Sequence, residues 1–170
     1  MVRHRITGAV LLAGAEARLE GIIVPGASLA GTDLAGADLT EAHLVGADLT
    51  GADLHGICLQ KAWLQGAKLS FCDLTGACLA YATLMDADLN TAQLSLANLQ
   101  GVNLEGANLY GADLFGVNLC GANLCRASLQ GADLAEALLE SVCMNGARYD
   151  DQTRWPEGFD PALHGARKVK

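Results

Sequence analysis

The stretch ADLTGADLHG, residues 47–56, contains the pattern that decides the fold. Its two leucines stand five residues apart, and leucine occupies every fifth position without a break from Leu29 to Leu139, which is 23 consecutive positions. Neither an α-helix, with about 3.6 residues per turn, nor a long strand, with a period of about two, explains this spacing. A short internal period instead indicates a repeat architecture, in which each unit buries its apolar side by stacking on the next.

The residues around each leucine indicate what the repeat builds. Two positions before the leucine the residue is alanine in 18 of the 23 repeats, and the position between them is mostly polar. Three consecutive strand residues point in, out and in, so the alanine and the leucine are expected to face the interior. The next two residues turn a corner, where glycines such as Gly51 and Gly56 tolerate the required backbone angles. We therefore expect an all-β solenoid whose coils stack about 4.8 Å apart around a filled core.

Tandem copies of A(D/N)LxG, such as residues 47–51 and 107–111, resemble the pentapeptide-repeat family. The resemblance covers residues 17–149, and it implies a right-handed four-sided β-helix with four pentapeptides in each coil. About 27 repeats then make just under seven coils, or a rod on the order of 32 Å long. We expect three parts: an N-terminal lead-in or cap over residues 1–16, the β-helix over residues 17–149, and a C-terminal capping tail over residues 150–170.

The charge of the chain restricts its partners. The formal net charge is −8, and residues 27–147 contain 13 acidic and three basic residues, for a net charge of −10. Phosphate backbones are neutralised by basic surfaces, so this composition argues against direct nucleic-acid binding. The chain has no run of 18 apolar residues, so a membrane-spanning helix is not expected. An acidic body suits a basic protein surface as its partner.

With four pentapeptides per coil, as the resemblance implies, one face collects five of the eight aspartates that directly precede a leucine. This acidic face is our candidate partner-binding site, and it consists of Asp33, Asp53, Asp73, Asp113 and Asp133. Neighbouring carboxylates would stand about 4.8 Å apart and would repel one another through a screening solvent. The first interpretation is that aspartate is the default residue of this position and that the face is simply solvated.

The alternative interpretation is that the acidic face imitates a nucleic-acid backbone. The resemblance implies this class of function, because some pentapeptide-repeat proteins are similar to DNA in size, shape and charge and bind DNA gyrase in place of DNA. Several gyrase-binding members have loops that bulge from the coils and tend to dimerise through an apolar C-terminal coil. Residues 17–147 contain no insertion, and a proline-containing tail follows them. We therefore predict a scaffold rod for an unidentified protein partner, with gyrase binding as the alternative.

The sequence contains no catalytic constellation, and no cofactor or metal is expected. The repeat period accounts for the glycines, and His43 and His55 belong to different faces with no nucleophile placed beside them. We therefore predict that the protein is not an enzyme. Cys58 and Cys78 are 20 residues apart and would stack in adjacent coils, within disulfide reach by their Cα spacing. Free thiols in a reducing cytoplasm are the favoured interpretation of this pair.

Both open ends of a stacked coil expose unpaired backbone and have to be covered. We expect Trp155 and Phe159 to fold over the last coil, with a partner anchor as the alternative role. At the N-terminus, two arginines precede a short apolar stretch over residues 6–15, and residues 15–17 read AEA, like a signal-peptide cleavage site. We expect a cytoplasmic protein, with export as the alternative if residues 1–17 are a signal peptide.

Overall fold

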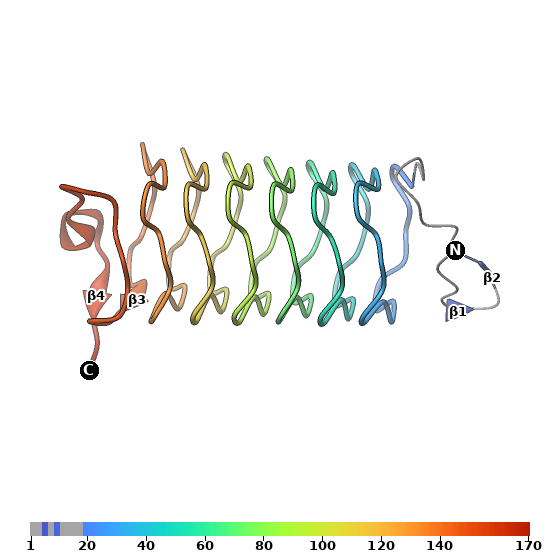
Figure 1. The fold of residues 1–170 in the computed structure, drawn as a ribbon, viewed down its shortest axis with the longest axis horizontal. Coiled ribbons are helices and arrows are strands. Elements are labelled where there is room, and N and C mark those ends of the chain that lie inside the picture. The colour runs from blue at the N-terminus through green and yellow to red at the C-terminus, as the bar shows by residue number, and fades with distance from the viewer. Residues whose placement is uncertain (1–4, 7–8, 11–18) are drawn as a thin grey trace.

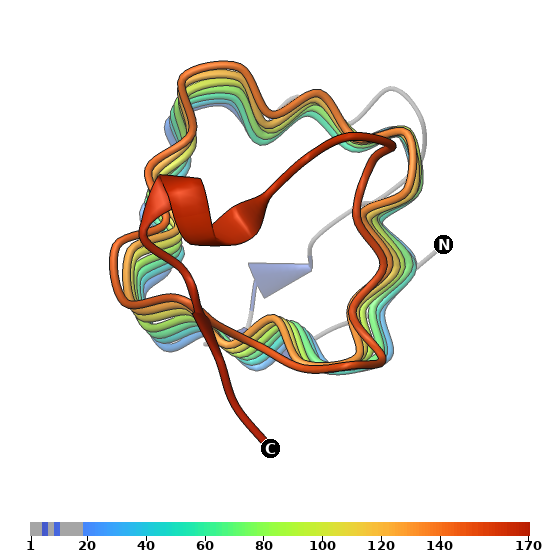
Figure 2. The same cartoon turned by 90° about the vertical axis from the view of Figure 1, so that its left-hand side faces the viewer.

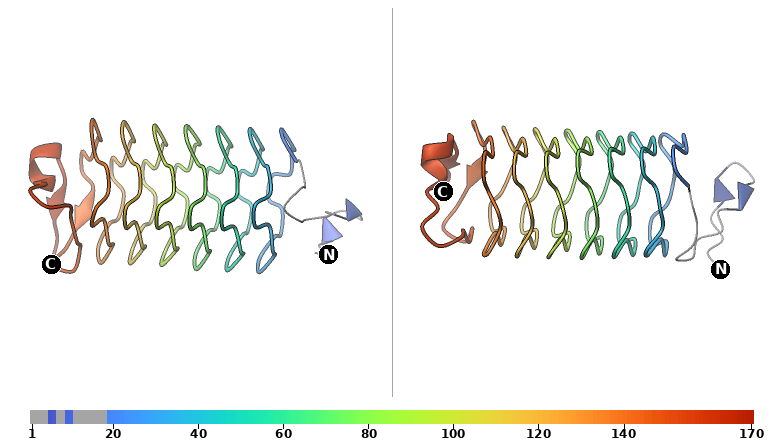
Figure 3. Two further views of the ribbon diagram at one scale, coloured as in Figure 1. Left: turned by 45° about the horizontal axis from the view of Figure 1, so that its top comes forward. Right: turned by 90° about the horizontal axis from the view of Figure 1, so that it is seen from above.

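The computed structural model describes residues 5–6, 9–10 and 19–170, and most of this chain forms a straight rod of stacked coils (Figures 1 and 3). Isolated parallel bridges join each coil to the next. From Ile23↔His43 to Ser128↔Arg148, every one of these bridges links residues that are 20 apart. Since four pentapeptides fill this interval, one coil uses four repeats. The expected β-helix solenoid is confirmed.

Leucine and the small residue two positions before it fill the interior of the coils. Leu74, Ala77 and Leu84 have no exposed surface, and one continuous hydrophobic core runs from Ala27 to Ala147. The residue between them forms the bridge and points outward, so the in–out–in interpretation of the repeat is confirmed. Figure 2, a view along the rod, shows successive coils in register with one another. Burying one leucine side chain contributes about 1.5–3 kcal/mol, which makes this core the main source of stability.

Backbone hydrogen bonds hold each corner in place. The Leu49 N–H donates to the Lys68 carbonyl of the next coil at 2.8 Å, and the Gly51 N–H donates to the Ser70 carbonyl at 2.9 Å. Gly51 has a φ of 65°, in the left-handed region where a side chain costs about 1–2 kcal/mol. Ten residues other than glycine occupy this corner position in other repeats, with φ between 52° and 62°: Glu41, Lys61, Phe71, Tyr81, Asp86, Thr91, Leu96, Arg126, Glu136 and Ser141.

Two short strands precede the rod. β1 (Arg5–Ile6) and β2 (Ala9–Val10) pair in antiparallel fashion. The other residues of the predicted lead-in, and the residues 15–17 that resemble a cleavage site, lie outside the described residues. The first expected repeat also begins there, so the number of repeats stays a prediction.

The chain leaves the repeat at β3 (Arg148–Tyr149), which pairs in parallel with β4 (Arg167–Lys168). Between these strands lies the 3-10 helix η1 (Pro161–His164), and the carboxylate of Asp160 caps it by accepting the Ala162 N–H at 2.9 Å. Over residues 5–6, 9–10 and 19–170, no helix has the length and apolar character needed to cross a membrane.

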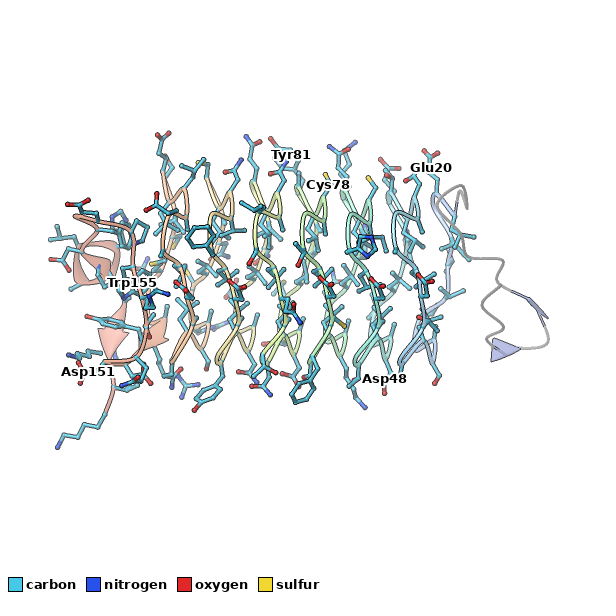
Figure 4. The ribbon with its side chains drawn as sticks, viewed as in Figure 1. Glu20, Asp48, Cys78, Tyr81, Asp151 and Trp155 are labelled. Atoms are coloured by element: carbon cyan, nitrogen blue, oxygen red, sulfur yellow. The ribbon has the colours of Figure 1, made fainter. Side chains whose placement is uncertain are left out.

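Aromatic side chains of the tail pack against the end of the core. Tyr149, Trp155 and Phe159 are partly buried there. The Trp155 ring meets Tyr149 edge-on at 5.6 Å between centroids and stacks on Phe159 at 5.4 Å. Figure 2 shows the tail lying across the open end of the last coil, and Figure 4 shows Trp155 at the C-terminal end of the rod. These rings extend the apolar packing beyond the last coil, and the capping role of residues 150–170 stays a prediction.

Candidate functional site

Bridges between successive coils place the aspartates of the acidic face in one row. Read from the N-terminal end, the row is Asp33, Asp53, Asp73, Gln93, Asp113, Asp133 and Arg154. The last step, from Asp133 to Arg154, is one position longer than the others because the chain has left the repeat. The structure therefore brings all five predicted residues onto one face, in the order that four repeats per coil predict. Whether a partner binds there stays a prediction.

Each aspartate of the acidic face also closes its own corner. Its Oδ1 accepts the backbone N–H of the residue two positions later, at distances between 3.0 and 3.2 Å. On other faces, the side-chain oxygens of Asn98 and Asn108 accept the equivalent N–H at 3.1 and 3.2 Å. An amide oxygen thus serves the corner as a carboxylate does. The corner therefore uses either acceptor and does not require a negative charge.

Positive groups compensate part of the charge of the acidic face. Nδ1 of His55 lies 2.8 Å from Oδ1 of Asp53. This hydrogen bond lowers the pKa of Asp53 below its usual 3.8 and raises the pKa of His55 above its usual 6.5. At the C-terminal end, a guanidinium nitrogen of Arg154 lies 2.5 Å from Oδ2 of Asp133. A partner would therefore meet a row in which Asp133 is paired with an arginine and Asp53 shares a hydrogen bond with His55.

A second outward row, on another face, is apolar and aromatic. Bridges pair Ile23 with His43 and His43 with Trp63, and the rings of the last two stack with centroids 5.0 Å apart and planes 7° from parallel. Ile23 is 69% exposed and Trp63 is 49% exposed, and Val45 at the adjoining corner is 40% exposed. The five-residue period alone does not group these residues. The interval of four repeats is the signal in the sequence that brings them together.

The cysteines differ in their surroundings, although all six are free thiols. Cys58 and Cys78 are direct bridge partners, as their spacing predicts, and Sγ of Cys58 lies 3.1 Å from Oγ1 of Thr40. Cys72 is buried and donates its S–H to the Leu49 carbonyl at 2.8 Å, and burial raises its pKa to about 11. Because the thiolate is the reactive form, Cys72 is inert at neutral pH.

A cavity of about 340 Å³ lies where the tail meets the last coil. It is lined by Ala137, Leu139, Glu140, Ser141, Pro156, Glu157, Gly158, Phe159 and His164. The imidazole of His164 stacks on Phe159 with centroids 4.6 Å apart, so this ring takes part in the packing of the tail. Within the described part of the chain, no group of three or more His, Cys, Asp or Glu side chains is placed to hold a metal ion.

The family model named Pentapeptide repeats matches this chain in eight copies, over residues 26–56, 59–90, 92–131 and 120–148. The chain belongs to the pentapeptide-repeat family. No curated protein matches the chain. Solved structures do match it, and several of them are of pentapeptide-repeat proteins.

One of these pentapeptide-repeat structures is HetL, a protein involved in heterocyst differentiation regulation in the cyanobacterium Nostoc. It is 25% identical, with 88% of this chain and 84% of that chain covered and a TM-score of 0.49. A trypsin-treated form of QnrB1, a plasmid-mediated fluoroquinolone resistance protein, has a TM-score of 0.56 at 18% identity, with 91% and 87% covered. A protein of the Arabidopsis thaliana thylakoid lumen is 31% identical, with 64% and 74% covered and a TM-score of 0.44.

Proposed function

We propose that this pentapeptide-repeat protein is a non-enzymatic rod that binds another protein through side chains on the outside of its coils. Leucine and alanine occupy the interior, so the groups that a partner can reach lie on the outward faces. The complete rod is a right-handed four-sided β-helix of about 27 repeats, and residues 150–170 cap its C-terminal end. It uses no cofactor and acts in the cytoplasm.

The charge of the acidic face is the observation that carries this proposal. Asparagine closes the corner on other faces, yet five of the six bridging positions from Asp33 to Asp133 hold aspartate. Two unit charges about 4.8 Å apart in water repel each other by about 0.9 kcal/mol before salt screens them. A basic partner surface relieves this repulsion and adds long-range attraction during association. The proposed partner is therefore a protein with an elongated basic surface.

Replacing aspartate by asparagine tests the charge without removing the acceptor of the corner. The face variant carries three changes: Asp53→Asn, Asp73→Asn and Asp113→Asn. The control variant makes the same change of net charge on other faces: Asp38→Asn, Asp48→Asn and Asp88→Asn. Each control aspartate accepts the same backbone N–H two positions later, at 3.1 to 3.2 Å.

The measurement is the capture of proteins from a bacterial lysate by the immobilised rod, followed by elution with salt. The wild type and the control variant should retain the same protein. The face variant should retain it at least about tenfold more weakly, which corresponds to about 1.4 kcal/mol. Equal retention by the face variant would show that the acidic face is only solvated.

A DNA mimic that binds DNA gyrase is the second candidate function. The net charge of −10 over residues 27–147 favours it. Duplex DNA carries about one charge per 1.7 Å, or about 19 over a rod of about 32 Å, so this rod has roughly half the charge density of DNA. The test is a gyrase supercoiling assay titrated with the wild type, the face variant and the control variant, with and without a quinolone. The DNA-mimic function is supported if the wild type and the control variant inhibit gyrase or protect it from the drug, while the face variant does not. It is excluded if the wild type has no effect at micromolar concentration.

A further inference from the structure

Side chains of successive coils contact one another along a diagonal as well as across the bridges. The residue directly after a leucine reaches the outward residue 18 positions later, in the next coil. Side-chain atoms approach to between 2.5 and 3.3 Å in four such pairs: Thr40 with Cys58, Ser70 with Asp88, Ser95 with Asp113, and Glu105 with Asn123. The contact recurs because both residues flank one hydrogen bond between coils, such as that from the Leu69 N–H to the Asp88 carbonyl at 2.7 Å.

Cys125 and Cys143 occupy this diagonal. The Leu124 N–H donates to the Cys143 carbonyl at 2.7 Å, and Cys125 directly follows that leucine. Both side chains are half-buried, both thiols are free, and each thiol influences the pKa of the other. Among the six cysteines, this is the one pair with the diagonal separation. The repeat therefore places two accessible thiols next to each other on the diagonal between two coils.

The two sulfurs differ in acidity. A hydrogen bond from the Asn145 backbone N–H, followed by one from Cys125, lowers the pKa of Cys143. The side-chain amide of Asn145 also lies 3.5 Å from Sγ of Cys143. Burial, followed by the hydrogen bond with Cys143, raises the pKa of Cys125. Since the thiolate is the attacking species in thiol–disulfide exchange, Cys143 is the thiol that reacts first with an external disulfide.

We propose that Cys125 and Cys143 form a redox modification site, which a low-molecular-weight disulfide such as oxidised glutathione converts into a disulfide joining two successive coils. The Cys143 thiolate attacks one sulfur of the oxidant, whose S–S bond breaks and releases one glutathione thiolate. Cys125 then loses its proton and attacks the Cys143 sulfur of the mixed disulfide, releasing the second thiolate. The protein loses two electrons and two protons, and the oxidant becomes two thiols.

Cys58 and Cys78 provide an internal comparison. They are direct bridge partners, but Sγ of Cys58 contacts Thr40 along the diagonal. A disulfide needs Cβ atoms about 3.5–4.5 Å apart and a dihedral near about 90°. Side chains of direct bridge partners run side by side at the coil spacing of about 4.8 Å, which is wider than this range. Side chains of successive coils meet along the diagonal, so the diagonal pair is better placed to form a disulfide than the pair that the bridge alone brings together.

The test uses the reduced full-length protein, incubated with oxidised glutathione at neutral pH. Free thiols are counted by alkylation under denaturing conditions, and intact masses are measured. The wild type should lose two of its six thiols with no retained glutathione, and dithiothreitol should restore both. The Cys125→Ser variant should instead retain one glutathione on Cys143, because the second thiol that expels it is missing.

A double variant, Cys58→Ser with Cys78→Ser, is the matched control, and it should lose two thiols at the rate of the wild type. A wild type that keeps all six thiols would overturn the proposal. Loss of two thiols that persists in Cys125→Ser and disappears in the double variant would also overturn it. That result would place the disulfide at the bridge pair.

Discussion

Gly101→Ala should destabilise the rod more than Gly51→Ala, because a side chain of the preceding coil covers Gly101. Both glycines are corner residues with nearly equal φ, 63° and 65°. A Cβ added at Gly51 would meet no atom within 4 Å, whereas a Cβ added at Gly101 would lie 2.6 Å from Cε1 of Tyr81. Figure 4 shows Tyr81 on the outside of the coils. The two substitutions therefore share the backbone strain and differ in the clash.

The size of each effect follows from these two contributions. An L side chain in the left-handed region costs about 1–2 kcal/mol, which is the whole effect expected for Gly51→Ala. The Tyr81 ring must also turn away from an alanine at 101, and leaving its rotamer costs about 0.5–1.5 kcal/mol more. Gly101→Ala should then cost about 1.5–3.5 kcal/mol. Adding Tyr81→Ala should remove the second contribution and leave the first.

The measurement is urea unfolding followed by circular dichroism. It is made on the wild type, both glycine variants, Tyr81→Ala, and the double variant that combines Gly101→Ala with Tyr81→Ala, which completes a double-mutant cycle. A coupling energy below about 0.3 kcal/mol would refute the reasoning, as would equal losses for the two glycine variants. The same reasoning applies to the corner at Gly116, where an added Cβ would lie 2.9 Å from Cδ2 of Leu96.

The remaining predictions concern the core, the acidic face and the thiols. Leu74→Ala should cost about 2–5 kcal/mol in urea unfolding, since it empties a fully buried site, and an unchanged midpoint would contradict its role in packing. Changing Asp53 and Asp73 to asparagine together should keep or slightly raise the urea midpoint, because the corner acceptor remains while the repulsion disappears. The raised pKa of His55 and the lowered pKa of Asp53 mean that their hydrogen bond stabilises the fold between about pH 3.8 and 6.5 and weakens outside this window. His55→Gln should therefore lower the midpoint more at about pH 5.5 than at about pH 8.5, and a pH-independent difference would refute this. Cys72, whose pKa is raised to about 11, should react with iodoacetamide in the folded protein only after the half-buried thiols have been labelled, as peptide mass spectrometry would show.

The core of the rod could be predicted from the sequence because the leucine period is strict. Small residues and leucines alternate with one outward residue, and the structure buries every leucine of the five-residue period from Leu29 to Leu139. The five-residue period does not determine how many repeats make one coil. The family resemblance implied four, and the bridges between residues 20 apart agree. Once this interval is known, the members of the acidic face follow from the sequence.

Contacts between side chains at the corners could not be predicted in the same way. The direction of a side chain at a corner depends on the local backbone, so the diagonal contact between coils is not visible in a five-residue pattern. For this reason the sequence does not place Cys125 beside Cys143, whereas it predicts that Cys58 and Cys78, favoured as free thiols, stack in adjacent coils. The stacking of His43 on Trp63 depends in addition on the rotamers of both rings. The longer step from Asp133 to Arg154 comes from the tail, where the period has ended.

The interval of four repeats per coil also determines how such a gene can grow. Duplication or loss of a four-repeat segment adds or removes one whole coil, and every later residue keeps its side of the rod. Duplication of a single pentapeptide between Asp33 and Asp113 keeps the leucines inside but shifts everything downstream by a quarter of a coil, so Asp113 and Asp133 would no longer lie in one row with Asp33. Insertions in multiples of four repeats therefore lengthen a recognition surface, whereas other insertions scatter it, although both preserve the fold.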